Sequence, residues 1–436
     1  MEGLWQICLG TYYFQGLDVK VKILHVNYYD KWTGSGIAVN RLHTALRRSG
    51  IDSHMLVMRK DSDDPTIHEA SRFPDYTTAF LTQRIAAQIL KLQHSVNPAP
   101  HSLNIFSNPV IQMIKRINPD IVHLHWIGGE MLSIQQLPQI PYPLVWTLHD
   151  SWAFCGTEHY PDVREHTPRF VEGYTRENCS LPQKGLDIAR FVWECKRKYW
   201  TGLNVAFTAP SRWLSGSLSR SKLFFGRECV TIPNCIDLDV FSPVSSSEAR
   251  KKWGIPVNVR VILFGAQSTD NPLKGVLFLR DALVKLQERN QGEKYILLIF
   301  GKNSDDSLFQ SCGFPCIQTG TIQNVKDMVS VYQASDVFVC PSLIDNLPNT
   351  VMEATACGIP TVAFHVGGLL DLIHHRSHGY LALPYDVQDL ADGIEWCLNA
   401  PAEIRRNARE YALQNFSEEI VARLFTKLYE KIWRKE

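Results

Sequence analysis

Residues 343–368 read LIDNLPNTVMEATACGIPTVAFHVGG, and this stretch decides the fold class of the chain. An apolar run at 337–341 precedes its loop and predicts a buried strand. A polar loop, a short helix over 349–356, a stop at Gly358 and a second apolar strand over 361–364 follow. Strand, helix and strand in this order are typical of a βαβ unit, which indicates an α/β fold with parallel strands.

Two acidic residues lie eight positions apart in this stretch. Asp345 is in the loop, where Asn346 is expected to cap the helix and Pro348 suits its first turn. Glu353 is on the helix among small and apolar neighbours, which argues against a freely solvated glutamate. A carboxylate in such a place can accept both hydroxyl hydrogens of a ribose diol. The glycine pair at 367–368 would let the next loop approach closely.

The same alternation of apolar runs and helical patterns extends over the whole chain. It predicts two Rossmann-like domains that face each other across a central cleft, with the ligand at the carboxyl ends of the strands. Strands are predicted at 22–27, 53–58, 121–125, 144–148, 204–209 and 229–232, and then at 259–265, 295–301, 316–318, 337–341 and 361–364. Helices are predicted at 36–49, 275–288, 325–333, 349–356 and 417–435.

Composition indicates where the domains divide. A segment rich in Pro and Ser, 238–256, is predicted to be a linker that leads into a short helix. It would separate an N-terminal domain, 19–237, from a C-terminal domain, 257–415. Residues 416–436 are expected to form a helix that crosses back to the N-terminal domain. Residues 1–18 are expected to be an extension without the basic start of a secretory signal.

The overall composition excludes several classes of protein. The 436 residues are 45% hydrophobic and 20% charged, which is typical of a globular chain with more than one domain. The net charge of +1 gives no electrostatic reason to expect nucleic acid as a partner. Eleven cysteines without any CxxC favour reduced thiols over a disulfide framework. A structural metal at Cys155, Cys179 and Cys195 is an alternative, but their spacing does not match compact zinc modules.

Three further features follow predicted strands. Gly34, Ser35 and Gly36 open a helix whose free N–H groups attract an anion, although a simple tight turn explains them equally well. Lys274 opens another helix and can pair with a diphosphate, and a solvated surface lysine is the alternative. His149 directly follows an apolar strand, where ligands bind, and a capping or core-edge histidine is the alternative.

These motifs resemble those of a known family. SLIDNLPNTVMEATACGIPTVAFHVGG, TIPNCIDLDVFSP and TLHDSWAFCGTEHY are similar to segments of the GT-B glycosyltransferases of family four, retaining enzymes that use nucleotide-activated sugars. The resemblance extends from about Val21 to the C-terminus. The acidic signature of that family is two glutamates separated by seven residues, which correspond to Asp345 and Glu353. Asp345 is one methylene shorter, so its reach is altered, as in relatives of the polysaccharide-assembly type that share the DNLPN pattern.

The resemblance implies roles for the site residues. Glu353 would hold the ribose hydroxyls of the donor, and Lys274 would bind its diphosphate. His149 and Asp345 would act at the transferred sugar as the catalytic residues. Pro272 and Leu273 precede Lys274, so a second basic residue for the phosphates must come from elsewhere or be missing. The other donor-binding residues implied are Gly34, Ser35, Gly36, Asn346, Leu347 and Asn349.

The function expected from this resemblance is retaining transfer of a sugar from a UDP- or GDP-sugar to a hydroxyl of a glycan or lipid-linked glycan. No cofactor and no metal are expected. A cytoplasmic protein is expected. The basic, amphipathic segments 82–92 and 190–200 suit peripheral contact at the inner face of the membrane, and a solvated helix face is the alternative. Two alternatives remain open at this point: a nucleotide-sugar epimerase on the same scaffold, and a non-catalytic subunit that binds nucleotide sugars.

Overall fold

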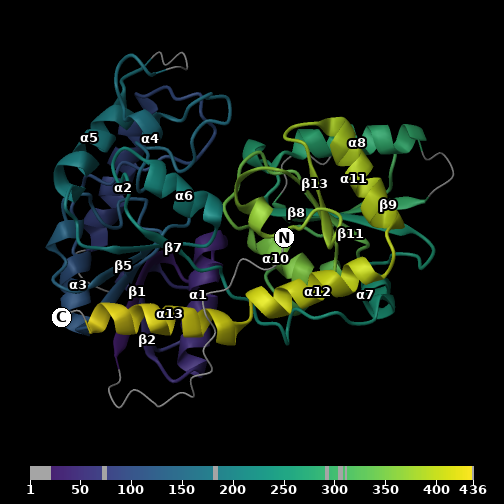
Figure 1. Ribbon diagram of the computed structural model, residues 1–436, viewed down its shortest axis with the longest axis horizontal. Coiled ribbons are helices and arrows are strands. Elements are labelled where there is room, and N and C mark those ends of the chain that lie inside the picture. The colour runs from purple at the N-terminus through teal and green to yellow at the C-terminus, as the bar shows by residue number, and fades with distance from the viewer. Residues whose placement is uncertain are drawn as a thin grey trace.

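The chain forms two domains that lie side by side, each built on one parallel sheet (Figure 1). The computed structural model describes residues 21–70, 76–179, 185–289, 294–302, 308–309 and 312–434. The expected extension at 1–18 lies outside these residues. Each sheet has a buried apolar cluster on both of its faces, because helices cover it from both sides.

The sheet of the N-terminal domain has seven strands in the order β3-β2-β1-β4-β5-β6-β7. The strand order reverses next to β1, so the carboxyl ends of β1 and β4 border a natural binding crevice. The strands are β1 (Lys22–Tyr29), β2 (Asp52–Arg59), β3 (Ile67–Glu69), β4 (Ile121–Leu124), β5 (Leu144–Thr147), β6 (Ala206–Ala209) and β7 (Cys229–Thr231). The α-helices are α1 (Thr33–Arg48), α2 (Tyr76–Lys91), α3 (Val110–Ile117), α4 (Arg169–Glu172), α5 (Ile188–Trp200) and α6 (Arg212–Arg220).

The sheet of the C-terminal domain has six strands in the order β10-β9-β8-β11-β12-β13. They are β8 (Arg260–Ser268), β9 (Tyr295–Lys302), β10 (Cys316–Gln318), β11 (Val337–Cys340), β12 (Thr361–Phe364) and β13 (Gly379–Ala382). The α-helices are α7 (Ser246–Lys252), α8 (Val276–Arg289), α9 (Val325–Gln333), α10 (Asn349–Ala356), α11 (Val387–Asn399) and α12 (Glu403–Asn415). Short 3-10 turns lie at η3 (Pro272–Lys274) and η5 (Gly367–Asp371).

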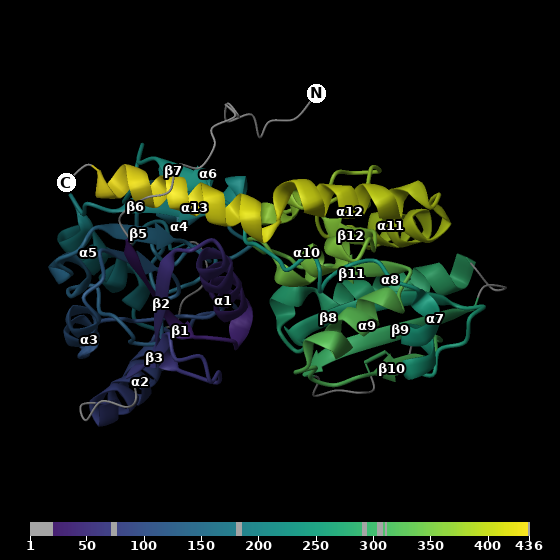
Figure 2. The ribbon, with the colours of Figure 1, turned by 90° about the horizontal axis from the view of Figure 1, so that it is seen from below.

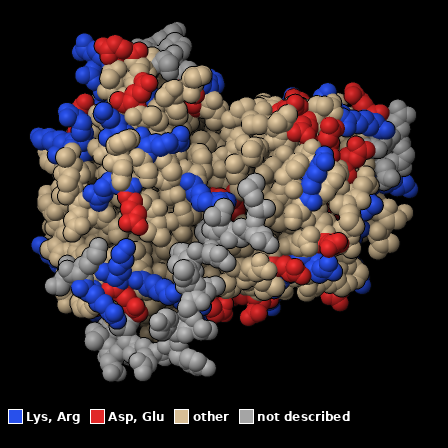
Figure 3. Space-filling view, viewed as in Figure 1, with Lys and Arg blue, Asp and Glu red and all other residues tan. Residues whose placement is uncertain are grey.

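Every strand predicted from the sequence overlaps a strand of the structure. β3 and β13 were not predicted, because β3 has three residues and β13 begins with glycine, so neither has a long apolar run. Several helices, such as α3, α6 and α11, were also not predicted. Among the described residues, no helix has the length and the apolar character needed to cross a membrane. Basic and acidic side chains are interspersed over both domains on the face in Figure 3.

The last helix, α13 (Glu418–Trp433), returns to the N-terminal domain. Figure 2 shows α12 and α13 following one another along both domains. Ser417 caps α13 by accepting a hydrogen bond from the Ile420 N–H. Phe425 and Tyr429 of α13 are buried in one cluster with Leu46 of α1. The final helix therefore ties the two domains together through an apolar contact.

We expect Phe425→Ala to lower the free energy of unfolding by about 3–5 kcal/mol, because Phe425 is only 2% exposed and the site cannot fully collapse. Arg423→Ala, at an exposed position of the same helix, is the matched control and should change stability little. Urea unfolding followed by circular dichroism measures both. A loss below about 1 kcal/mol for Phe425→Ala would contradict the contribution of α13 to the core.

Candidate active site

The candidate site lies where the carboxyl ends of both sheets face each other. From the C-terminal domain come η3, the loop between β11 and α10, and η5. From the N-terminal domain come the start of α1, the residues after β5, and the start of α6. These segments are far apart in sequence, and hydrogen bonds between the domains join them.

Asp345 is buried in the loop after β11, with 8% of its surface exposed. Its Oδ2 lies 2.6 Å from Nζ of Lys274 and accepts a hydrogen bond from Ser342 Oγ at 3.3 Å. Burial disfavours the charged form of Lys274, but the Asp345 carboxylate outweighs this effect and the pKa of Lys274 is raised. The structure thus brings Asp345 of the loop and Lys274 of η3 together as one ion pair.

The glycine pair at 367–368 touches the backbone of the Asp345 loop. A Cβ at Gly368 would lie 1.5 Å from the carbonyl oxygen of Asn346, and a Cβ at Gly367 would lie 2.2 Å from that of Asp345. The Gly368 N–H donates to the Asp345 carbonyl at 2.9 Å. The close approach expected from the sequence is confirmed, because only glycine leaves room for the neighbouring chain here.

Asn346 does not cap helix α10, so that prediction was wrong. Pro348 takes the N-cap position, and α10 has no side-chain cap hydrogen bond there. The side chain of Asn346 instead crosses to the N-terminal domain, where its Nδ2 donates to the His149 carbonyl at 3.1 Å. Its Oδ1 accepts from Ser211 Oγ at 2.6 Å. These demands from the N-terminal domain compete with capping, since one short amide cannot serve both places.

Glu353 on α10 is buried, with 5% of its surface exposed, and both of its oxygens have partners. Arg41 of α1 donates from Nη2 to Oε1 at 2.6 Å, and the Tyr332 hydroxyl donates to Oε2 at 2.9 Å. The other terminal nitrogen of Arg41, Nη1, is buried and has no hydrogen-bond partner. The expectation that Glu353 is not a solvated surface residue is confirmed, and its partner across the cleft is a cation.

The glycine segment in the first turn of α1 faces the start of α10. Asn349 Nδ2 donates to the Gly34 carbonyl at 2.9 Å. The Gly36 N–H donates to Thr33 Oγ1 at 3.3 Å, and the hydroxyl of Ser35 lies 3.2 Å from the same oxygen. A Cβ at Gly36 would lie 3.2 Å from the Tyr29 carbonyl, so this turn packs tightly on the end of β1.

Leu347 contributes differently from the polar residues around it. Its side chain is 6% exposed and packs in the apolar cluster of the C-terminal domain. Its backbone is therefore the part of this residue that is left for a ligand. Within the described residues, Asp345, Asn346 and Lys274 gather around one point, and Asn349 and Glu353 lie on the helix that follows.

His149 is half-buried at the end of β5 and is held from the inside of the N-terminal domain. Its Nε2 lies 3.1 Å from Nδ1 of His125. Burial lowers the pKa of His149 to about 4, against a smaller opposing effect of Asp150. The imidazole is therefore neutral at neutral pH, so it can donate or accept a hydrogen bond but does not carry a positive charge.

Three contributors were not predicted from the sequence: Arg41, Tyr332 and Ser211. Arg41 and Tyr332 reach Glu353 from positions 312 and 21 residues away, and neither has a motif of its own. Arg41 lies five residues after Gly36, about 1.4 turns further along α1, and its positive charge was the only available signal. Arg41 is a basic residue that reaches the site from the other domain, where it pairs with Glu353.

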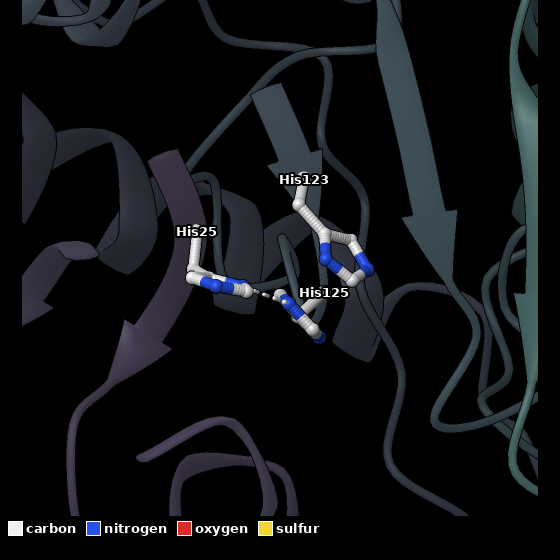
Figure 4. A group of neighbouring side chains, drawn as sticks. All are labelled: His25, His123 and His125. Carbon is white, nitrogen blue, oxygen red and sulfur yellow. Dashed lines mark hydrogen bonds between the residues drawn. The ribbon is translucent and has the colours of Figure 1, made fainter. Parts of the chain in front are cut away.

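The three cysteines considered as a metal site do not form one among the described residues. Cys155 is buried and unpaired, and Cys179 and Cys195 are partly exposed. In the part of the chain that the structure describes, the ligand atoms of three side chains come within 4.8 Å of one another only at His25, His123 and His125 (Figure 4).

Two models of known protein families match the chain, one in each domain. The family model "Glycosyltransferase Family 4" matches residues 32–240, and the model "Glycosyl transferases group 1" matches residues 245–415. The first covers the N-terminal sheet from α1 onward, and the second covers the C-terminal sheet. The chain belongs to the glycosyltransferases of family four.

One relative of this family-four protein is D-inositol 3-phosphate glycosyltransferase from Saccharomonospora viridis. The two are 32% identical over 202 residues, which is 43% of this chain and 46% of the relative. The alignment with this curated relative thus spans about half of its length.

Solved structures share the fold. Sucrose-phosphate synthase from Thermosynechococcus elongatus aligns with a TM-score of 0.68 and 20% identity over 95% of this chain and 100% of that chain. Anabaena HepE, in complex with UDP and glucose, aligns with a TM-score of 0.63 and 16% identity over 94% of this chain and 99% of that chain. The expected GT-B fold is confirmed.

Five histidines of the N-terminal domain should make this protein sensitive to acid. Burial lowers the pKa of His43 and His149 to about 4, and lowers the pKa of His25, His123 and His125 well below the ordinary value. The unfolded chain binds these protons near pH 6.5, so the unfolded state holds more protons between about pH 6.5 and about pH 4. Stability is therefore complete above about pH 6.5 and falls as the pH decreases.

His43→Gln tests this linkage outside the candidate site. At about pH 5 the wild type should have lost about 2 kcal/mol through His43 alone, and the variant should lack that part of the decrease. His166→Gln, at an exposed position, is the control. Urea unfolding at about pH 7 and about pH 5 measures the difference, and an equal decrease in all three proteins would contradict the assignment.

Proposed function

We propose that this chain transfers a sugar from a UDP- or GDP-sugar to a hydroxyl of a glycan or lipid-linked glycan, with retention of configuration. The observation that carries the proposal is the convergence of Lys274, Asp345 and His149. Lys274 Nζ lies 2.6 Å from Asp345, and the next residue, Asn346, binds the His149 carbonyl at 3.1 Å. An ion pair of an acid and a cation thus lies next to the backbone of a histidine from the facing Rossmann-like domain, which argues against a non-catalytic subunit.

The donor would lie along the C-terminal domain. Glu353 would accept the ribose hydroxyls, and Lys274 would pair with the diphosphate. Since Glu353 is bonded to Arg41, a ribose can reach its Oε1 only when Arg41 moves away. The freed Arg41 would then supply a second positive charge on the donor side of the cleft. The complex of the fold neighbour HepE with UDP and glucose supports a nucleotide sugar as the donor class.

The chemistry would depend on electrostatic stabilisation of the leaving diphosphate. Lys274 and the N–H groups at the start of α1 would stabilise the charge that develops on the leaving group. We propose that no metal is needed, because a fixed cation and helix N–H groups supply this stabilisation. The described site has no carboxylate free of a cation or hydrogen-bond partner for a covalent intermediate, since Asp345 and Glu353 are both paired. Attack from the face of the leaving group, with the phosphate accepting the proton, is therefore the step that we propose.

His149 and Asp345 would act at the transferred sugar. His149 would hydrogen-bond a sugar oxygen near the reacting carbon, and Asp345 with the Asn346 and Leu347 amides would hold further hydroxyls. Closure of the two domains would exclude water and limit hydrolysis of the donor.

The acceptor and the location are also part of the proposal. Leu81, Ile85 and Leu92 on and just after α2 are 59%, 41% and 52% exposed, and basic Arg84 and Lys91 lie between them. Such an amphipathic face fits contact with an anionic membrane, which would place a cytoplasmic protein next to lipid-linked acceptors. Flotation with anionic vesicles tests this contact, and no binding at low salt would contradict it.

Lys274→Met should reduce release of UDP or GDP from nucleotide sugars by about 100-fold, because the leaving diphosphate loses its cation. Methionine keeps the apolar stem of the lysine. Lys252→Met is the matched control, since Lys252 also pairs with an aspartate, Asp327, but outside the site. A panel of UDP- and GDP-sugars with nucleotide detection measures both variants. Equal turnover in Lys274→Met and wild type, or no turnover of any donor by a folded wild type, would contradict the proposal.

Glu353→Gln should raise the donor KM by about tenfold with a smaller change in kcat, since the ribose is bound but does not react. Glu418→Gln provides the control, because Glu418 also pairs with an arginine of α1, Arg48, away from the cleft. Steady-state kinetics with the preferred donor separate the two parameters. A fall in kcat at unchanged KM would place Glu353 at the reacting centre instead.

A further inference from the structure

A chain of three histidines leads from the cleft into the core of the N-terminal domain. His149 Nε2 lies 3.1 Å from His125 Nδ1, and His125 Nε2 lies 2.9 Å from His25 Nδ1. The last of these hydrogen bonds is drawn in Figure 4, where the rings of His25 and His125 point toward one another. His149 follows β5, His125 follows β4, and His25 lies in β1, so three neighbouring strands of the sheet hold the chain.

The two ends of this chain differ in their surroundings. At the inner end, His25 is fully buried, and its Nε2 has no hydrogen-bond partner. At the outer end, His149 is half-buried, and its Nδ1 has no hydrogen-bond partner among the described residues. Burial keeps the pKa of all three imidazoles low, so each ring carries a single N–H.

One N–H in each ring leaves only two arrangements. If His125 donates to His25, then His149 must donate from Nε2 to His125, and the N–H of His25 is on Nε2. If His125 donates to His149, then His25 donates from Nδ1 to His125, and the N–H of His149 is on Nδ1. No other arrangement makes both hydrogen bonds, because His125 has one proton to donate and one lone pair to accept.

The surroundings of His25, at the buried end, decide between the two proton arrangements. The first arrangement leaves an N–H group of His25 in the core without an acceptor, and the second leaves only an unused lone pair there. Buried N–H groups without a partner are rarer in folded proteins than acceptors with an unused lone pair. We infer that His25 and His125 act as positioning residues that hold His149 in the Nδ1–H tautomer, so that a hydrogen-bond donor faces the cleft.

This inference rests on the proposed function for its consequence. The neutral Nδ1–H group of His149 donates a hydrogen bond to a lone pair of an oxygen in the transferred sugar. The same nitrogen cannot serve as a base. It would thus stabilise a sugar oxygen close to the reacting carbon without adding a full charge. Fixing the tautomer in advance removes the need to reorganise the site when the donor arrives.

The third histidine of Figure 4 stands outside this chain. His123 Nδ1 lies 2.7 Å from the Tyr429 hydroxyl, and its Nε2 lies 2.7 Å from Thr147 Oγ1. Both of its nitrogens are therefore occupied, and a metal ion shared by the three rings would have to break these bonds. The hydrogen-bonded arrangement explains the cluster without an ion.

Nuclear magnetic resonance of histidine-labelled protein at about pH 7 tests the tautomer directly. The ¹⁵N shifts distinguish a protonated from an unprotonated ring nitrogen, and His149→Gln assigns the signal. We expect His149 to show a protonated Nδ1 and an unprotonated Nε2 in the wild type. His25→Leu removes the inner donor and should shift His149 toward a mixture of tautomers. His25→Asn keeps an N–H donor at the place of Nδ1 and should restore the wild-type signal.

Kinetics supply the second measurement. We expect His25→Leu to lower kcat/KM about tenfold, which corresponds to one hydrogen bond, and His25→Asn to recover most of it. Tyr429→Phe perturbs the neighbouring His123 but not the three hydrogen-bonded histidines, so the His149 signal should stay as in the wild type.

Three results would overturn the inference: an Nε2-protonated His149 in the wild type, an unchanged His149 signal in His25→Leu, or a stoichiometric metal in the purified protein. Because the shifts are measured without a donor, they remain decisive if no nucleotide sugar is turned over. Failure of the proposed function and failure of the tautomer assignment are thus separate outcomes.

Discussion

The buried carboxylate of Asp345 and the ammonium group of Lys274, 2.6 Å apart, hold together the loops at the cleft. An unpaired charge at this depth would cost several kcal/mol, so the end of η3 and the loop after β11 have to stay in register. The same loop is fixed from its other side by the glycine pair at 367–368, whose backbone touches the carbonyls of Asp345 and Asn346. The position of this loop, its ion pair with Lys274 and its close contact with the glycine pair therefore depend on one another.

Contacts between the domains extend from the same loop. Asn346 binds Ser211 and the His149 carbonyl, and Glu353 binds Arg41. The two domains are consequently held together by polar groups that would also bind a nucleotide sugar. Binding of the donor and closure of the empty cleft would compete for Glu353, whereas Asp345 and Lys274 are already arranged. Donor binding would therefore release the Arg41 contact, because its loss is offset by contacts between the donor and Glu353.

The sequence predicted the fold well because both sheets consist of apolar runs between turn residues. Glu353 could be placed correctly, since its small and apolar neighbours indicated burial. Asn346 was misplaced as a helix cap, because local rules cannot include a partner 197 residues away, His149. Arg41 and the chain from His149 to His25 were not predicted for the same reason: each contact joins different strands or domains, and no motif encodes it. Local pattern thus predicts elements and their ends, but side-chain partners across a cleft require the assembled structure.

The most direct measurement is a crystal structure of the protein with a bound UDP- or GDP-sugar. The diphosphate should lie against Lys274, the ribose hydroxyls should replace Arg41 on Glu353, and His149 Nδ1 should face an oxygen of the sugar. A nucleotide bound elsewhere, or one bound while the ion pair of Arg41 and Glu353 stays intact, would contradict the donor site described here.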